Sequence, residues 1–203
     1  EVEQDPPTYS IVAEGGAAGN DVVSEGQGYA LLISGIVLAS AEPNDPNRDS
    51  MIDIFYGYFN GWKKMAELSS INAGNCQSTK FCASGSIACL PGWKFPKELN
   101  GIIGSGSAPD GDVDAITGMV FGVQAVADDA TKPVWFEEVR QWADASATQF
   151  MYHETVASST GENRIVKLGS CWGGWDSNGN NPSYHSPGSY RIMRDYQANF
   201  SGR

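Results

Sequence analysis

The feature of this 203-residue sequence that most limits its fold is an alternation between two kinds of helical segment. Segments that are apolar on nearly every side alternate with segments that are apolar on one side only. A helix that is apolar all round must be covered by other elements, whereas an amphipathic helix can leave one side in water. The alternation therefore predicts an all-α fold with an inner ring of buried helices inside an outer ring of amphipathic ones.

The first of these helices is expected to begin at Ser24 and to be buried nearly all round. Ser24 as N-cap and Gln27 three residues later fit a capping box. The apolar residues that follow have helical spacing on more than one side of the helix. They are Tyr29, Leu31, Leu32, Ile33, Ile36, Val37 and Leu38.

Four more helices follow. The second covers about residues 49–68 and is amphipathic, the apolar third begins near Asp110, and the amphipathic fourth comes after Pro133. The fifth begins at Ser186 and Pro187, because serine suits the N-cap and proline the first helical position. We expect one helical domain over residues 1–203, interrupted at 70–109 by a long cysteine-rich connection of the kind that is usually functional or cross-linked.

Composition and charge exclude several classes of partner. The formal net charge is −11, from 24 acidic and 13 basic residues. Without a run of Lys or Arg there is no track for phosphates, so nucleic acid is not expected. No apolar run reaches the ~18 residues that cross a bilayer, so no membrane is expected either. The chain opens at Glu1 without an initiating Met, which fits a processed chain or an excerpt from a longer one.

The four cysteines indicate an oxidising compartment. Cys76, Cys82 and Cys89 lie in the long connection and Cys171 lies far from it. An even count favours two disulfides and a secreted protein. The alternative is a zinc site, but no Cys-x-x-Cys occurs. Three pairings remain possible, and no metal or cofactor is expected.

Glu25 is the first candidate for chemistry. It lies in the first turn of a buried helix, between Ser24 and Gly26, with Gly28 close behind. Each glycine costs a helix about 1 kcal/mol, which indicates that open space around the carboxylate is worth keeping. The alternative is a surface acid that the positive end of the helix dipole favours.

Asp110 is the second candidate, at the start of the third helix in the acidic run 110–114. It either caps that helix or pairs with Glu25, as the two carboxylates of glycosidic cleavage do. The run lacks the glycine and the glutamate that a calcium-binding loop has at its sixth and twelfth positions. Trp172, Trp175 and Tyr184 lie among glycines, where they suit either stacking on sugar rings or packing in the core.

Three segments resemble successive signatures of glycoside hydrolase family 8, in the order of that family. They are residues 24–29 (SEGQGY), 108–112 (APDGD) and 181–187 (NPSYHSP). The resemblance covers about residues 21–196. It implies an (α/α)6 barrel and inverting hydrolysis of a β-1,4 glycan such as a cellulose-like or mixed-linkage glucan, xylan or chitosan.

The resemblance also implies roles for the candidates. Glu25 would be the proton donor, buried at the active site, and Asp110 would hydrogen-bond the sugar and help to distort its ring. Tyr184 would help to place the attacking water, and Trp172 or Trp175 would stack on a sugar. Two further residues, Tyr29 and Asp112, are counted with the substrate-binding set.

The chain departs from the family because the usual general base, an aspartate, lies beyond the last signature found here. About half of the barrel is expected, which would leave inner-helix surface exposed at a cost of about 25 cal/mol per Å². A further segment or partner chain would then complete the barrel and supply the base. The alternative is a catalytically inactive relative that serves as an extracellular glycan-binding or structural subunit.

We predict that the four cysteines form two intrachain disulfides, at least one of which staples the 70–90 region. Oxidation is expected because of the even count and the secreted class. Mass analysis after alkylation without reductant should find no alkylated cysteine, and the same analysis after reduction should find four. Four alkylated cysteines before reduction would exclude this prediction.

Overall fold

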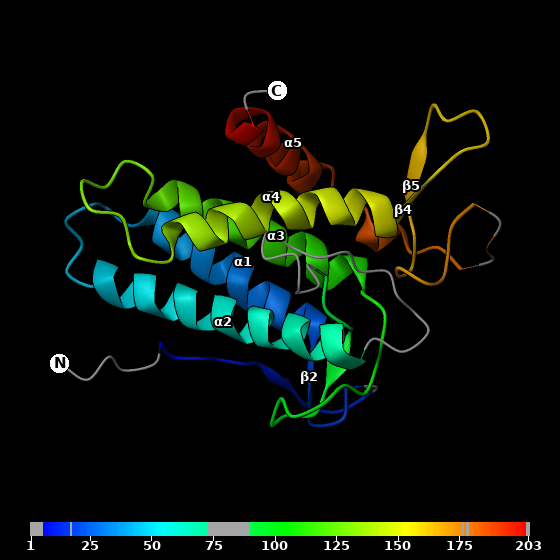
Figure 1. Ribbon diagram of the computed structural model, residues 1–203, viewed down its shortest axis with the longest axis horizontal. Coiled ribbons are helices and arrows are strands. Elements are labelled where there is room, and N and C mark those ends of the chain that lie inside the picture. Colours follow the sequence, from blue (N-terminus) through cyan, green and yellow to red (C-terminus); the bar gives the residue numbers. More distant parts are fainter. Residues whose placement is uncertain (1–5, 17, 73–89, 176, 178, 202–203) are drawn as a thin grey trace.

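The computed structural model describes residues 6–16, 18–72, 90–175, 177 and 179–201, and most of them are helical (Figure 1). All five expected helices are present, and the second extends further at both ends than expected. Their bounds are α1 Ser24–Ser40, α2 Arg48–Asn72, α3 Pro109–Ala125, α4 Phe136–His153 and α5 Pro187–Ser201.

Two small antiparallel sheets and one 3-10 turn accompany the helices. The first sheet has the strand order β1-β2-β3 and the second pairs β4 with β5. Val22 pairs with Val12 on one side and with Phe95 on the other. Because β2 runs directly into α1, this sheet fixes where α1 begins. The bounds are β1 Val12–Ala13, β2 Asp21–Val23, β3 Lys94–Phe95, β4 Thr155–Ala157, β5 Arg164–Val166 and η1 Pro182–Tyr184.

Helices α1 and α3 lie side by side in unusually close contact (Figure 1). A Cβ atom added to Gly28 would lie 2.3 Å from the carbonyl oxygen of Gly111. Two helical turns further on, a Cβ atom on Gly35 would lie 2.4 Å from the carbonyl oxygen of Gly118. Both contacts advance by seven residues in the same direction, so the two helices are parallel and begin at the same end of the molecule.

This contact corrects the interpretation of Gly28. The sequence suggested that Gly28 leaves open space beside Glu25. In the structure, the missing side chain of Gly28 is what lets the backbone of α3 approach, so this glycine serves packing.

The core forms around α3, which also contacts α4 and α5. Ile116, Met119 and Val120 of α3 are fully buried. The outer helices contribute the stripes that their periodicity predicted, including Phe55, Phe59 and Trp62 from α2 and Val139, Trp142 and Phe150 from α4. The alternation is therefore confirmed for the first four helices, with α1 and α3 as inner and α2 and α4 as outer helices, whereas most residues of α5 are exposed or half-buried.

The prediction that α1 is buried nearly all round is wrong. The exposed fractions of its apolar side chains are 47% for Tyr29, 61% for Ile33, 43% for Ile36 and 44% for Val37. Helix α1 is covered by α3 and α2, and no helix among the described residues covers its remaining side. This is the exposure expected of about half a barrel.

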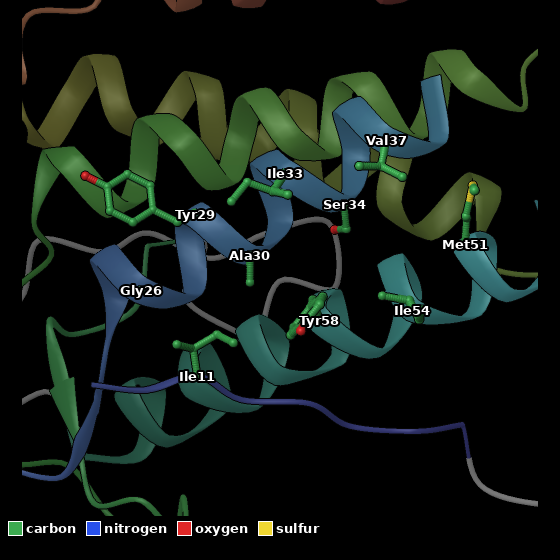
Figure 2. Close-up of a pocket in the computed structure, with 10 residues that line it drawn as sticks. All are labelled: Ile11, Gly26, Tyr29, Ala30, Ile33, Ser34, Val37, Met51, Ile54 and Tyr58. Atoms are coloured by element: carbon green, nitrogen blue, oxygen red, sulfur yellow. The ribbon is translucent and has the colours of Figure 1, made fainter. Parts of the chain in front are cut away.

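The uncovered side of α1 forms an apolar groove with α2. The groove has a volume of about 470 Å³, and Figure 2 shows Ile33 and Val37 of α1 opposite Met51, Ile54 and Tyr58 of α2. Among the described residues, none of the helices has the length and apolar character needed to cross a bilayer.

The expected capping box at Ser24 and Gln27 is also wrong. The N-cap of α1 is Val23, and no side chain caps it. The buried amide of Gln27 instead accepts a hydrogen bond from the Ile11 N–H at 3.1 Å and donates to the carbonyls of Tyr9 at 3.0 Å and Tyr58 at 2.8 Å. A buried amide must find partners, and here tertiary contacts supply three of them.

The cysteines are only partly accounted for. Cys171 is not a free thiol, whereas Cys76, Cys82 and Cys89 lie outside the described residues. The two disulfides therefore stay a prediction.

We predict that Gly28→Ala lowers the free energy of unfolding by about 1–3 kcal/mol, as overpacking of a tight contact does. The added methyl group would meet the backbone of Gly111, which cannot rotate away. The matched control is Gly188→Ala in α5, where an added Cβ atom meets nothing within 4 Å. The control should be neutral or stabilising by up to about 1 kcal/mol. Urea denaturation of both variants measures the difference, and equal midpoints would contradict the packing role of Gly28.

Candidate active site

A cavity of about 450 Å³ opens where α1 and α3 begin. It is lined by residues from both helix starts, from the segment before α3, and from the two loops that precede α5. The lining residues are Ala18, Val23, Ser24, Glu25, Trp93, Ala108, Asp110, Leu168, Trp172 and Tyr184. The parallel packing of α1 and α3 thus brings Glu25 and Asp110 into one cavity, as the sequence predicted.

Glu25 is exposed and is held by its neighbour on the next turn of α1. The Tyr29 hydroxyl donates a hydrogen bond to Glu25 Oε1 at 3.1 Å. Desolvation and the adjacent Glu25 carboxylate raise the pKa of Tyr29 to about 12, so its hydroxyl stays protonated and acts as a donor. The burial expected for Glu25 is not provided by the described part of the chain.

Asp110 lies half-buried at the second residue of α3. Its Oδ1 accepts a hydrogen bond from the Gly111 N–H at 2.8 Å. Burial raises the pKa of the Asp110 carboxyl, and the negative charge of Glu25 adds to that rise, although the Gly111 N–H opposes it. The two carboxyl groups therefore interact electrostatically across the cavity.

The aromatic candidates separate into two places. Trp172 is 40% exposed and lines the cavity with Glu25, together with Tyr184. Burial and the Asp110 carboxylate raise the pKa of Tyr184. Trp175 is 46% exposed but lines a neighbouring cavity, where its indole N–H donates to the Val156 carbonyl at 3.0 Å.

Asp112 does not belong to the substrate-binding set, and this expectation is wrong. Its side chain is fully buried and does not line the cavity. Two residues along a helix correspond to a rotation of about 200°, so Asp112 points away from the side that carries Asp110. It meets Glu154, a buried residue that the sequence did not single out.

Two further residues near the cavity also escaped sequence reasoning. Asp114 follows Asp110 by one turn, and desolvation, then the charges of Asp110 and Glu25, raise its pKa to about 6. The i,i+4 spacing from Asp110 could have revealed it. Trp93 lines the cavity from the segment before α3, and its carbonyl accepts the Ser24 N–H at 3.0 Å. Nothing local in the sequence marks that contact.

The chemistry available here is that of two carboxyl groups beside aromatic rings. Within the described ranges, no group of three or more His, Cys, Asp or Glu side chains could hold a metal ion. The two carboxyl groups lie in unlike surroundings, because Glu25 is exposed and Asp110 is half-buried.

We predict that Asp110→Asn lowers the pKa of Asp114 from about 6, because one of the negative charges that raise it is removed. The pKa should stay above its ordinary value, since desolvation is the larger cause. Carboxyl carbon NMR titration measures the shift. Glu42→Gln, a change at an exposed residue in the α1–α2 turn, should leave the titration of Asp114 unchanged. An unchanged titration in Asp110→Asn would contradict the electrostatic coupling.

Comparisons with known proteins support the fold. No family model matches the chain. Endoglucanase C of Ruminiclostridium cellulolyticum is 24% identical over 201 residues, which cover 94% of this chain and 33% of that protein. The chain therefore spans about a third of the length of this relative.

Two solved structures have similar folds at low sequence identity. The endo-β-1,4-glucanase CMCax of Acetobacter xylinum superposes with a TM-score of 0.61 at 17% identity, covering 95% of this chain and 48% of that one. Endoglucanase Cel10 of Klebsiella pneumoniae, a family 8 glycosyl hydrolase, gives a TM-score of 0.54 at 16% identity and covers 98% and 54%. The resemblance to glycoside hydrolase family 8 is thus confirmed at the level of the fold, an (α/α)6 barrel of which this chain forms about half.

Proposed function

We propose that this chain carries part of the active site of an inverting glycoside hydrolase that acts on β-1,4-linked glucan. The observation that carries the proposal is the shared cavity of Glu25 and Asp110 at the parallel starts of α1 and α3, beside Trp172 and Tyr184. The similarity to proteins named as endoglucanases supports glucan before xylan or chitosan, and it does not favour an inactive glycan-binding subunit.

Substrate binding would begin at Trp172. An exposed indole suits the apolar C–H face of a sugar ring, while the hydroxyl rim of the sugar needs polar partners. Asp110 and Tyr184 lie on the same cavity wall and could supply them. We assign Trp172, rather than Trp175, to the stacking role because Trp175 lines a different cavity.

Glu25 is the proposed general acid. The Tyr29 hydroxyl occupies Oε1 of Glu25, which leaves Oε2 to carry the proton that passes to the leaving glycosidic oxygen. A positioned general acid of this kind is worth about 10²–10⁴-fold in rate.

Asp110 is proposed to hold the sugar at the point of cleavage. One of its oxygens accepts the Gly111 N–H, and the Tyr184 hydroxyl is a further hydrogen-bond partner of the carboxylate. These two contacts fix the carboxylate, which would accept a sugar hydroxyl through a remaining lone pair. A hydrogen bond of this kind that strengthens as the ring distorts lowers the barrier by favouring the transition state.

The base that activates water is proposed to come from outside this sequence. Inversion needs a second carboxylate about 6.5–9.5 Å from the acid, with room for a water. Among the described residues that line the cavity, the carboxylates are Glu25 and Asp110, and Asp110 is assigned to the sugar. A further segment or chain that completes the barrel would supply the base, and Tyr184 would help to place the water. We also propose that the protein is secreted and that its cysteines are paired.

The test combines binding and turnover. Hydrolysis of soluble β-1,4-glucan, xylan and chitosan is measured with the full-length protein that the reading frame encodes. NMR follows the anomeric configuration of the released sugars. Glucan should be cleaved with inversion. Glu25→Gln should reduce turnover at least about 10²-fold, while calorimetry should find glycan affinity within about twofold, because the amide keeps the shape but carries no proton to donate.

Two further variants separate binding from chemistry. Asp110→Asn should weaken both affinity and rate, because the sugar loses a charged partner. Trp172→Ala should weaken affinity about tenfold, which corresponds to about 1.4 kcal/mol, whereas its control Trp175→Ala should not. Retention of configuration, or a wild-type rate for Glu25→Gln, would overturn the mechanism.

A further inference from the structure

Behind the cavity lies a pair of carboxyl groups that the proposed mechanism does not use. Asp112 and Glu154 are both fully buried, and their side chains interact with one another. None of their four carboxyl oxygens, nor the buried hydroxyl of Ser107 beside them, has a conventional hydrogen-bond partner among the described residues. Two ionised carboxylates cannot be buried side by side without a large cost in solvation and repulsion.

A proton held between the two groups removes that cost. A protonated carboxyl donates a short, strong hydrogen bond to an ionised one. Burial raises the pKa of Asp112 well above its usual range, with the charge of Glu154 as the next cause. Burial also raises the pKa of Glu154 to about 7, against the lowering effects of Asp112, Ser107 and Lys167. At neutral pH the pair therefore retains at least one proton.

Among the described residues, few other charged groups lie near the pair. Asp110 lies near it on α3, and Tyr190 faces Glu154 from α5. His153 precedes Glu154 at the end of α4. Lys167 is the nearby cation, and its ammonium group donates to the carbonyls of His153 and Ser170. Because the Lys167 ammonium group is hydrogen-bonded to carbonyl groups, the shared proton remains the main factor that offsets the repulsion between the two carboxyl groups.

The pair lies where three segments meet. Asp112 is in the first turn of α3, and its N–H donates to the Ala108 carbonyl at 3.2 Å. Glu154 directly follows α4, and its carbonyl accepts the Lys167 N–H at 2.8 Å. Next to the pair, Ser107 and Ser170 are joined by two hydrogen bonds of 2.9 and 3.1 Å. These segments also carry Asp110, Leu168 and Trp172 to the cavity wall.

We propose that Asp112 and Glu154 share a proton and act as positioning residues, which hold the start of α3 and the 167–172 segment, and with them Asp110 and Trp172, around the cavity. The consequence for glycan binding rests on the proposed function of that cavity. The shared proton and its effect on the start of α3 do not.

The sign of the pH dependence follows from the raised pKa values. The folded protein keeps protons on this pair that the unfolded chain has already released above its ordinary carboxyl pKa. The pair therefore stabilises the fold most when it is fully protonated, and stability falls as the pH rises from about 5 to about 7, where Glu154 ionises in the folded state. The amide in Glu154→Gln cannot ionise, so this variant should lack the part of the decrease in stability that Glu154 causes.

The first measurement is urea denaturation at pH 5 and pH 8. The urea midpoint of the wild type should be lower at pH 8 than at pH 5. This decrease should be smaller in Glu154→Gln. The matched control is Glu42→Gln at an exposed site, in which the wild-type fall should persist. If Glu154→Gln and Glu42→Gln show the same fall as the wild type, the pair does not share a titrating proton and the proposal is overturned.

The second measurement tests positioning without any ligand. Amide hydrogen exchange over residues 107–115 should be faster in Glu154→Ala than in the wild type by at least tenfold, and Glu154→Gln should restore protection because the amide can still donate to Asp112. If Glu154→Ala fails to fold, the double change Asp112→Asn with Glu154→Gln replaces it, because two amides can pair without a proton. That double variant should keep protection and show the smaller pH dependence. Unchanged exchange in Glu154→Ala, or lost protection in the double variant, would overturn the positioning role.

The third measurement links the pair to the cavity. The dissociation constant for a soluble β-1,4-glucan oligosaccharide should rise about tenfold in Glu154→Ala and stay within twofold in Glu154→Gln. If the wild type binds no glycan, the proposed function fails, while the denaturation and exchange measurements still decide the inference. If the wild type binds and Glu154→Ala binds equally well, the pair does not position the cavity wall.

Discussion

The close approach of α1 and α3 is the contact on which the rest of this structure depends. Two glycines on each helix, seven residues apart, remove the side chains that would otherwise separate the two backbones. Because both contacts advance in the same direction, the helices are parallel and their N-terminal ends lie together. Those ends carry Glu25 and Asp110, and the partial positive charge of each helix N-terminus favours an acid there. Packing therefore determines which two carboxylates meet, although neither takes part in the contact.

The same arrangement explains why the fold is open on one side. Helix α1 is covered by α3 and α2, and its apolar residues on the third side form the groove with α2. An inner helix of a closed barrel would be covered there by another inner helix. Under the proposed function, a single completing segment next to α1 would cover the groove and also lie beside Glu25, where the proposed base is needed. The coverage of about half of the solved relatives agrees with this.

The site has two levels that differ in their electrostatics. At the cavity wall, Glu25 is exposed and Asp110 is half-buried, so solvent can reach both. Beneath them, Asp112 and Glu154 are closed to water and can remain together only with a proton between them. Burying two acids behind the cavity costs more free energy than burying apolar side chains. Their hydrogen bond is directional, however, and directional contacts suit cavity side chains that must be placed within fractions of an ångström.

How much of this could be predicted depends on the range of the interaction. The number, order and character of the five helices follow from periodicity along the chain, and the candidates Glu25, Asp110, Trp172 and Tyr184 follow from local motifs, because each signal lies within a few residues. The role of Gln27, the contact of Gly28 with Gly111 and the meeting of Asp112 with Glu154 join residues 16 to 83 positions apart in the chain. Local patterns do not identify such distant partners. For that reason the sequence suggested that Gln27 caps a helix, that Gly28 leaves space beside Glu25 and that Asp112 binds a ligand. The sequence by itself determined which helices form and that α1 and α3 carry acids in their first turns. Only the tertiary structure decided which of those acids face the cavity and which are buried behind it, because that choice depends on the rotation of α3 against its neighbours.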